Sequence, residues 1–178
     1  MKFTIDFSNP IADLSLAISD VARAWYIDAP QFSPVVLGEW TGSVAQGGSV
    51  NFFNVQFNPH AHGTHTETAG HITEKRNSIN EHFRDFMTKS LVLTLRPQEG
   101  RVRFEDFRAV WSQAEAKGWT FAAKSVIFRT NTGDDPTHKT FSGTDWPFLE
   151  AAIGSFLREQ GVDHLIIDQP SVDQEEDG

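Results

Sequence analysis

The sequence predicts an α/β fold built on a mixed β-sheet, with helices packed on the sheet. Two observations lead to this prediction. In the second half of the chain, strand-like segments alternate with amphipathic segments of about 10 to 15 residues, the order that gives a βαβαβ unit and parallel strand pairing. In the first half, short segments of alternating apolar and polar residues indicate further strands, which we expect to be antiparallel.

The first half contains three predicted strands. Residues 2–7 and 13–18 alternate in polarity, as strands do when one face is buried. Residues 50–57 alternate as well, but the phase shifts at the Phe52-Phe53 pair, as a β-bulge would cause. These segments are expected to add antiparallel strands to the sheet.

A long loop is predicted between these strands, over residues 22–49, because the segment shows little periodicity. It is rich in aromatic residues, among them Trp25, Tyr26, Phe32 and Trp40. Two interpretations of these residues stay open. They either pack, against the sheet or at a subunit interface, or they form an aromatic wall for a substrate.

The second half begins with a predicted helix, because apolar residues recur at helical spacing from Ser78 to Met87 and Ser78 with Glu81 has the spacing of a capping box. Strands are predicted over residues 90–95, 125–130 and 164–168. A helix over about 104–117, which ends at Gly118, lies between the first two strands, and a helix that begins at Pro147 and ends at Gly161 lies between the last two. Ligands bind beyond the carboxyl ends of such strands, so we expect the site in the loops after Phe57, Leu95, Thr130 and Asp168.

Composition excludes several classes of function. The 15 basic and 24 acidic side chains give a formal charge of −9, without a basic stripe, so nucleic acid is not an expected partner. The absence of cysteine excludes disulfide frameworks, thiolate nucleophiles and zinc fingers. Apolar runs are far shorter than the roughly 20 residues of a membrane helix, and the N-terminus lacks a signal-peptide pattern. We expect a cytoplasmic protein with no membrane partner.

The seven histidines are unevenly distributed, and four of them fall within 12 residues: His60, His62, His65 and His71. A proline and two glycines interrupt this segment, so it is predicted to be a loop and not a helix. Imidazole nitrogens together with the carboxylate of Glu67 suit Zn²⁺ or Mn²⁺. A bound divalent ion lowers the pKa of a coordinated water toward about 7, which supplies a nucleophile without serine or cysteine.

The histidine segment resembles the signature of the cyclase-type metal-dependent hydrolases, a family that includes bacterial kynurenine formamidase. The signature reads H-x-G-T-H-x-D-x-P-x-H, and Gly63-Thr64-His65 and His71 fall in register with it. Three further stretches are similar to family elements: residues 13–16 to the first core strand, 128–130 to the end of the central strand, and 168–173 to a late D-x-P-S-x-D element. The resemblance implies the swivelling β/β/α fold, homodimers or homotetramers, and one or two Zn or Mn ions.

The same resemblance assigns roles. It makes His65 a metal ligand, puts Glu67 in the place of the metal-bridging aspartate, and makes His71 a ligand or the proton-transfer residue, so His71 and Glu67 are the expected catalytic residues. The first histidine of the signature falls at Ala61, and either His60 or His62 would replace it. A shift of one residue in an extended loop turns a side chain to the opposite face. We favour His62, because it lies directly beside the Gly-Thr-His turn.

The end of the chain bears on the metal site. In family members a further histidine and glutamate follow the late element, whereas this sequence ends at Gly178. We therefore expect one domain over residues 1–172, followed by an acidic tail or a truncation point over 173–178. Asp168 either caps the turn before Pro170 or supports the metal loop from behind.

The resemblance implies a hydrolase that uses metal-activated water to cleave the carbon–nitrogen bond of a small amide, formamide or cyclic amide. The alternative is a catalytically degenerate protein of the same fold that binds a metal or ligand. An enzyme needs an open coordination position, whereas a structural metal site is usually closed.

Overall fold

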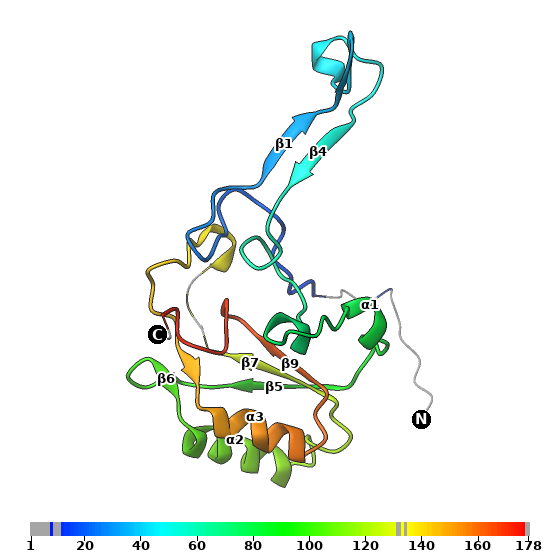
Figure 1. The fold of residues 1–178 in the computed structure, drawn as a ribbon. Helices are drawn as coiled ribbons and strands as arrows, with labels where there is room; N and C mark the ends of the chain where they lie inside the picture. Colours follow the sequence, from blue (N-terminus) through cyan, green and yellow to red (C-terminus); the bar gives the residue numbers. More distant parts are fainter. Residues whose placement is uncertain (1–7, 9–11, 131–132, 134, 177–178) are drawn as a thin grey trace.

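The structure is a computed structural model that describes residues 8, 12–130, 133 and 135–176. Over these residues it contains three α-helices and several small β-sheets, so the predicted α/β class is confirmed. Figure 1 shows two parts: a body that holds the helices and the parallel sheet, and a long hairpin that projects away from it. No helix in the described part of the chain is long and apolar enough to cross a membrane.

The body is the predicted βαβαβ unit. Its sheet consists of β5 (Ser90–Thr94), β7 (Ser125–Arg129) and β9 (His164–Ile167), which pair in parallel in the order β5-β7-β9. The helices α2 (Phe104–Ala116) and α3 (Ala151–Glu159) lie on one face of this sheet (Figure 1). Each helix crosses from one parallel strand to the next, as this topology requires.

The core of the body lies between the sheet and the two helices. Alternate strand residues and helix residues three or four apart point into it, and they include Leu91, Leu93, Val126, Phe128, Phe107, Trp111, Ile153 and Leu157. Phe107 is 0% exposed. Its ring centroid lies 5.7 Å from that of Phe128 and 5.9 Å from that of Trp111. The helical and strand periodicities of the sequence therefore meet in a single core.

The start of α3 differs from the prediction. Pro147 does not open the helix, because β8 (Phe148–Leu149) pairs in parallel with β6 (Arg101–Val102) before α3 begins. The Glu150 carboxylate also accepts a hydrogen bond of 2.8 Å from the Phe104 amide at the start of α2. Both contacts are long-range, so local sequence signals did not reveal them.

The helix predicted from Ser78 to Met87 is much shorter in the structure, where α1 covers only Ile79–His82. The Ser78 side chain makes no capping hydrogen bond, so the predicted capping box is wrong. Phe83 is already extended, and its ring packs edge-on against His164 of β9 with the centroids 5.2 Å apart. This contact with the body ends the helix.

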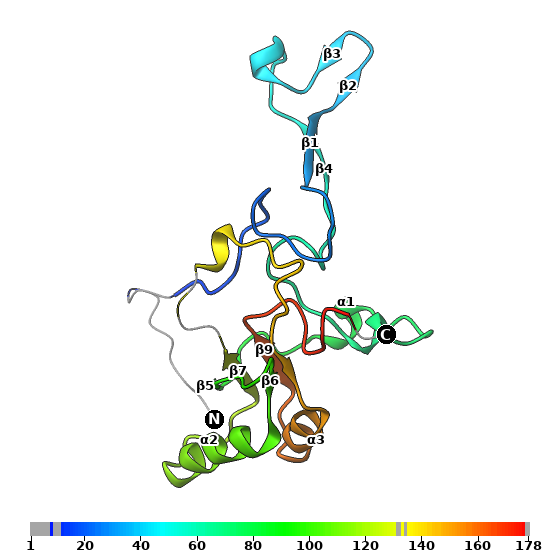
Figure 2. The same ribbon diagram turned by 90° about the vertical axis from the view of Figure 1, so that its left-hand side faces the viewer.

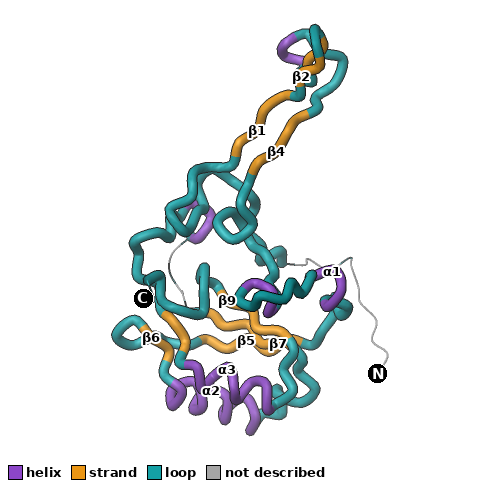
Figure 3. Tube along the Cα trace, viewed as in Figure 1, coloured by secondary structure: helices purple, strands orange, loops and turns teal. Residues whose placement is uncertain are grey.

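The hairpin replaces most of the predicted long loop. Its stem is β1 (Gln31–Pro34) paired antiparallel with β4 (Phe53–Gln56), and its tip contains β2 (Val36–Leu37) and β3 (Trp40–Thr41). These strands do not join the parallel sheet, so the predicted single mixed sheet is wrong in this respect. Figure 3 shows the stem strands leaving the body. Each strand finds its partner across the hairpin, and periodicity alone does not identify a partner.

The strand predicted over residues 13–18 does not form. Residues 13–18 are irregular, and residues 2–7 lie outside the part that the structure describes. Leu16 nevertheless has a partner: its amide donates to the Thr64 hydroxyl at 2.8 Å, and its carbonyl accepts from the Thr64 amide at 3.2 Å. This segment therefore tethers the histidine loop instead of extending a sheet.

Candidate metal centre

The histidine loop, residues 58–71, runs from the hairpin to α1 on the side of the sheet opposite α2 and α3 (Figures 1 and 2). It is not placed by the end of a parallel strand, as the sequence predicts, because β4 belongs to the hairpin. Instead the loop is held by the segment before the hairpin, where the Ala24 amide donates to the Ala61 carbonyl at 3.1 Å. The two alanines are buried together and anchor the loop.

Two glycines allow the close approaches within this loop. Gly63 has a φ of +79°, and a Cβ there would lie 2.9 Å from the Leu16 carbonyl, so a side chain would disturb the tether at Thr64. At Gly70 a Cβ would lie 2.6 Å from the Asn77 amide. The loop can therefore fold tightly enough to bring its histidines together.

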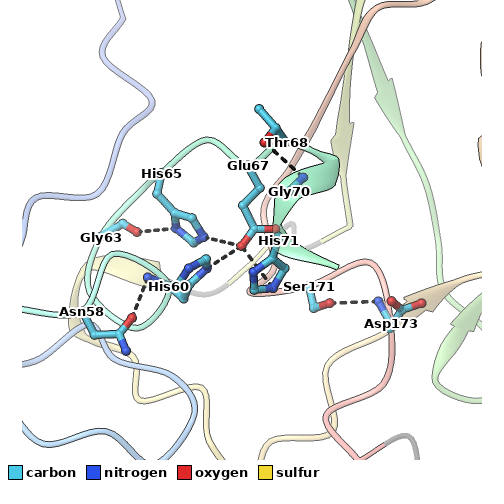
Figure 4. Close-up of polar contacts among 10 residues, drawn as sticks. All are labelled: Asn58, His60, Gly63, His65, Glu67, Thr68, Gly70, His71, Ser171 and Asp173. Carbon is cyan, nitrogen blue, oxygen red and sulfur yellow. Dashed lines mark hydrogen bonds and ion pairs between the residues drawn. The ribbon is translucent and has the colours of Figure 1, made fainter. Parts of the chain in front are cut away.

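Three imidazole rings converge on one carboxylate oxygen, Glu67 Oε1 (Figure 4). His60 Nδ1 lies 2.5 Å from this oxygen, His65 Nε2 lies 3.3 Å away and His71 Nε2 lies 3.6 Å away. The rings of His60 and His71 are stacked, with centroids 4.4 Å apart. All four side chains stay accessible, with exposed fractions between 23% and 48%.

These groups fit a divalent metal ion. The ligand atoms of His60, His65 and Glu67 all lie within 4.8 Å of one another. Ligands about 2.1 Å from a tetrahedral zinc lie about 3.4 Å apart, close to the distances that His65 and His71 make to the carboxylate. The donor set of imidazole nitrogens and a carboxylate oxygen is one that zinc and manganese accept.

A backbone carbonyl fixes the position of a proton on the His65 ring. Its Nδ1 lies 3.3 Å from the Gly63 carbonyl, which can only accept a hydrogen bond, so Nδ1 carries the proton. Nε2 faces Glu67 Oε1 at 3.3 Å, and a metal ion bound there would take the place of the proton on this nitrogen. A backbone carbonyl that fixes the tautomer in this way is the usual support for a metal-binding histidine.

Glu67 is held as a carboxylate by the histidines around it. Partial burial acts to raise its pKa, but the hydrogen bond from His60 and the charge of His71 act in the opposite direction. Together with the hydrogen bond from His65 they outweigh burial, and the pKa of Glu67 lies below its ordinary value of 4.5. The group is therefore available as an anionic ligand at neutral pH.

His62 does not take part in this cluster, although the sequence favoured it over His60. His62 is buried, with only 3% of its surface exposed. Nδ1 accepts a hydrogen bond of 2.9 Å from the Asn58 amide, and Nε2 lies 2.8 Å from the Asp28 carbonyl, to which it donates. Both ring nitrogens of His62 are thus hydrogen-bonded, and it is His60 that lies in the group with His65 and Glu67.

Sequence reasoning missed Asn58, whose side chain accepts a hydrogen bond of 2.9 Å from the His60 amide. The Asn-Pro pair that starts the loop was the signal, because asparagine commonly turns the chain in this way. It also missed the 3₁₀ turn Ala69–His71, whose start is capped by the Thr68 hydroxyl accepting from the Gly70 amide at 3.3 Å. These two turns orient His60 and His71.

An open pocket of about 370 Å³ lies beside the cluster. It is lined by His60, Thr66, Glu67, Thr68, Gly70, His71, Arg76 and Ile79. The aromatic residues of the predicted loop are not among these lining residues. Trp25 packs edge-on against Trp146 at 5.0 Å, and Phe32 and Trp40 lie in the hairpin. The packing interpretation of Trp25 therefore holds in this chain.

Asp168 caps the end of the neighbouring strand β7. One carboxylate oxygen accepts from the Thr130 amide at 2.8 Å, and the other accepts from the Thr130 hydroxyl at 2.7 Å. The acidic end is not wholly solvated either, because the Glu175 carboxylate accepts a hydrogen bond from the Gly143 amide. Both groups stabilise the loops that follow the parallel strands.

The fold and the cluster define an α/β protein in which a His60-His65-Glu67 group that could bind a divalent metal lies, with His71 beside it, next to an open pocket. The family model described as "Putative cyclase" matches residues 12–174. The chain therefore belongs to the cyclase family, as the resemblance of the histidine segment predicts. No curated protein matches the chain.

Proposed function

We propose that the protein is a metal-dependent hydrolase of the kynurenine formamidase type that cleaves the carbon–nitrogen bond of an amide, formamide or cyclic amide. The observation that carries the proposal is the convergence of three imidazole nitrogens on one oxygen of Glu67 at the wall of an open pocket. Membership of the cyclase family supports the same class of chemistry.

His60, His65 and Glu67 would hold the ion, Zn²⁺ or Mn²⁺, and the described residues offer this one set of ligands. A bound ion of this kind activates water and polarises a carbonyl oxygen. Binding requires the proton on His60 Nδ1 to leave, because that nitrogen now contacts Glu67 at 2.5 Å. Whether a second ion binds stays a prediction from the resemblance.

His71 is the proposed proton carrier. Its Nε2 is the ring atom turned toward the cluster, 3.6 Å from Glu67, and its side chain is half exposed in the pocket. An accessible histidine can take a proton from water near neutral pH and return it to a leaving nitrogen. Glu67 keeps the ring oriented through its negative charge.

The pocket also favours a class of substrate. Arg76 and Ile79 line it on the side of α1, next to His71 and Glu67. A guanidinium beside an aliphatic side chain suits a substrate with an anionic group on a small apolar frame. We therefore propose a small amide that carries a carboxylate.

Several finer predictions from the sequence belong to the same proposal. They are the swivelling β/β/α fold, a single domain over residues 1–172 followed by an acidic tail or a truncation point over 173–178, and a cytoplasmic location. The match of one family model from residue 12 to residue 174 supports the single domain. Assembly into homodimers or homotetramers stays a prediction.

The alternative function is a degenerate protein of the same family that holds a metal without turnover. The direct contact of His60 with Glu67 favours it, since the two groups already satisfy each other.

The test combines metal content with hydrolysis. We expect the tag-free protein to bind about one equivalent of Zn²⁺ or Mn²⁺ and to hydrolyse formyl amides, and we expect His65→Ala to lose the metal, because a methyl group cannot replace an imidazole ligand. His71→Ala should keep the metal and lose hydrolysis. Tight metal binding without hydrolysis of any amide would favour the degenerate protein, and full metal occupancy in His65→Ala would refute the ligand assignment.

A further inference from the structure

The loop between α2 and β7 and the segment before β5 expose apolar side chains at the same edge of the parallel sheet. Lys89 links the two, because its carbonyl accepts from the Lys124 amide at 3.0 Å and its Nζ donates to the Phe121 carbonyl at 2.5 Å. Four large apolar side chains of these segments are between 54% and 78% exposed, namely Phe86, Met87, Trp119 and Phe121. Figure 1 shows both segments on one side of the body, at the starts of β5 and β7.

Two lysines lie beside the aromatic rings of these segments. The Lys117 Nζ is 4.4 Å from the centroid of the Trp119 ring, and the Lys89 Nζ is 5.9 Å from that of the Phe121 ring. Both are cation–π contacts, in which an ammonium group lies over an aromatic face. Both lysines are exposed. The lysine–aromatic patch consists of Phe86, Met87, Lys89, Lys117, Trp119 and Phe121.

The patch is positively charged in a chain that is strongly negative. Residues 84–89 and 117–124 contain four basic side chains against one acidic side chain, a net charge of +3, whereas the whole chain carries −9. Lys124 is paired with Asp163 at 3.2 Å. Lys89 and Lys117 make no salt bridge within the described part of the chain, so their charges are available to a partner.

We propose that the lysine–aromatic patch docks the protein onto an anionic lipid surface. The aromatic rings and Met87 would enter the interfacial layer, and the ammonium groups would contact the anionic headgroups. Lysine suits this arrangement, because its aliphatic stem lies along apolar groups while its ammonium reaches the polar layer. Together the four apolar side chains present on the order of 500 Å², a size at which exposed apolar surface marks an interaction site.

The composition of the patch favours lipid over a protein partner. Lysine is depleted at protein–protein interfaces, whereas both lysines of the patch lie over its aromatic rings. The hairpin, residues 31–57, also exposes apolar side chains, but it contains no lysine or arginine, so it offers anionic headgroups no opposite charge. Charge therefore distinguishes the patch from the other exposed apolar surface of the molecule.

The negative charge of the whole chain does not prevent this docking. Charges more than about 10 Å apart are largely screened in about 0.1 M salt, so the residues next to the lipid decide the interaction. The sequence-based expectation of no membrane partner rests on the length of apolar runs. A contact with the lipid surface requires no spanning segment, and the proposal departs from that expectation for this reason.

The test measures binding of the full chain to lipid vesicles by co-sedimentation, with a chelator present so that no metal bridges the histidine loop and the lipid. The protein should bind vesicles of phosphatidylcholine with about one-third phosphatidylserine at least about tenfold more tightly than pure phosphatidylcholine, because lysines are attracted only to the anionic surface. Lys89→Gln with Lys117→Gln should weaken binding to the anionic vesicles about tenfold. Lys89→Arg with Lys117→Arg keeps both charges and is the matched control, which should bind like the wild type.

The apolar part of the patch has a separate readout. Brominated phosphatidylcholine quenches the fluorescence of tryptophans that enter the interfacial layer, so the anionic vesicles that contain it should quench the wild-type protein. Trp119→Phe should lose most of this quenching and still bind, because an aromatic ring remains in the patch. Trp40→Phe, in the hairpin, is the control and should leave the quenching unchanged.

Several results would overturn the proposal. They are an absence of binding to the anionic vesicles, equal binding to both kinds of vesicle, and unchanged binding in the glutamine variant. Quenching that is lost in Trp40→Phe and kept in Trp119→Phe would show that the hairpin meets the lipid instead. Binding of a single-stranded oligonucleotide in place of vesicles, weakened by the same glutamine substitutions, would overturn the proposal in favour of a nucleic acid.

Discussion

The body and the histidine loop are stabilised in different ways. In the body, α2 and α3 pack on the parallel sheet, and residues such as Phe107 and Ile153 are entirely buried. In the loop, residues 58–71, the side chains around Glu67 remain partly exposed and are positioned by individual hydrogen bonds. Apolar burial is worth more free energy than exposed polar contacts. Stability therefore resides mainly in the body, whereas the candidate metal ligands lie in a loop.

This difference teaches that functional and structural residues can be neighbours in sequence and still be separable. His60 and His62 are two positions apart, yet one contacts Glu67 and the other is buried between backbone groups. Substitutions can test this separation through their effects on the free energy of unfolding.

Phe107→Ala should have the largest effect, a loss of about 3–5 kcal/mol in the free energy of unfolding, because it opens a cavity in the centre of the body core. Urea unfolding followed by circular dichroism measures it. Gln113→Ala, at an exposed position of the same helix, is the control and should change stability by less than about 0.5 kcal/mol. A loss of less than about 1 kcal/mol in Phe107→Ala would mean that the body core does not dominate stability.

His62→Ala should come next, with a loss of about 1–3 kcal/mol, because it removes a buried ring together with its hydrogen bonds to the Asn58 amide and the Asp28 carbonyl. His60→Ala is the matched variant on the same loop. Measured in the presence of a chelator, it should stay within about 0.5 kcal/mol of the wild type, since its ring is half exposed. Equal losses in the two variants would refute the separation of structural and functional histidines.

A smaller effect is expected from pH. The folded-state pKa of Glu67 lies below 4.5, so the ionised carboxylate stabilises the fold above that pH, and this contribution is lost as the pH falls through the folded-state pKa. The metal-free wild type should therefore be slightly more stable than Glu67→Gln at neutral pH, and the difference should vanish in acid. Glu74→Gln removes a carboxylate outside the cluster and serves as the control. A difference that grows in acid would contradict the direction of the shift.

Arg76→Gln should have the smallest effect on stability, within about 0.5 kcal/mol, because Arg76 is an exposed residue at the pocket. Its effect should fall on substrate binding. We expect KM for a carboxylate-bearing amide to rise roughly tenfold, and KM for a neutral amide to stay unchanged. Lys75→Gln removes the adjacent charge, which is not among the pocket-lining residues, and should change neither value. An equal rise for both amides would argue against recognition of a carboxylate.

Local patterns predicted the body well. The helical spacing of Phe107, Trp111 and Ala114 and the glycines that follow α2 and α3 gave elements close to those in the structure. Patterns failed where a distant contact decided the outcome. α1 ends early because Phe83 packs on His164, and Phe148 is a strand residue because β6 is beside it. Burial periodicity is local information, whereas strand partners and loop contacts are not.

By itself the sequence determined the α/β class, the family and the segment that holds the candidate metal ligands, because helical and strand periodicity and the spacing of Gly63, Thr64, His65 and His71 are properties of neighbouring residues. Only the tertiary structure decided that His60 and not His62 faces Glu67, and that residues 31–57 form an arm. Both outcomes depend on groups distant in the chain: the Asp28 carbonyl that occupies His62, and the pairing of β1 with β4. A side chain's role follows from the partners that folding brings to it.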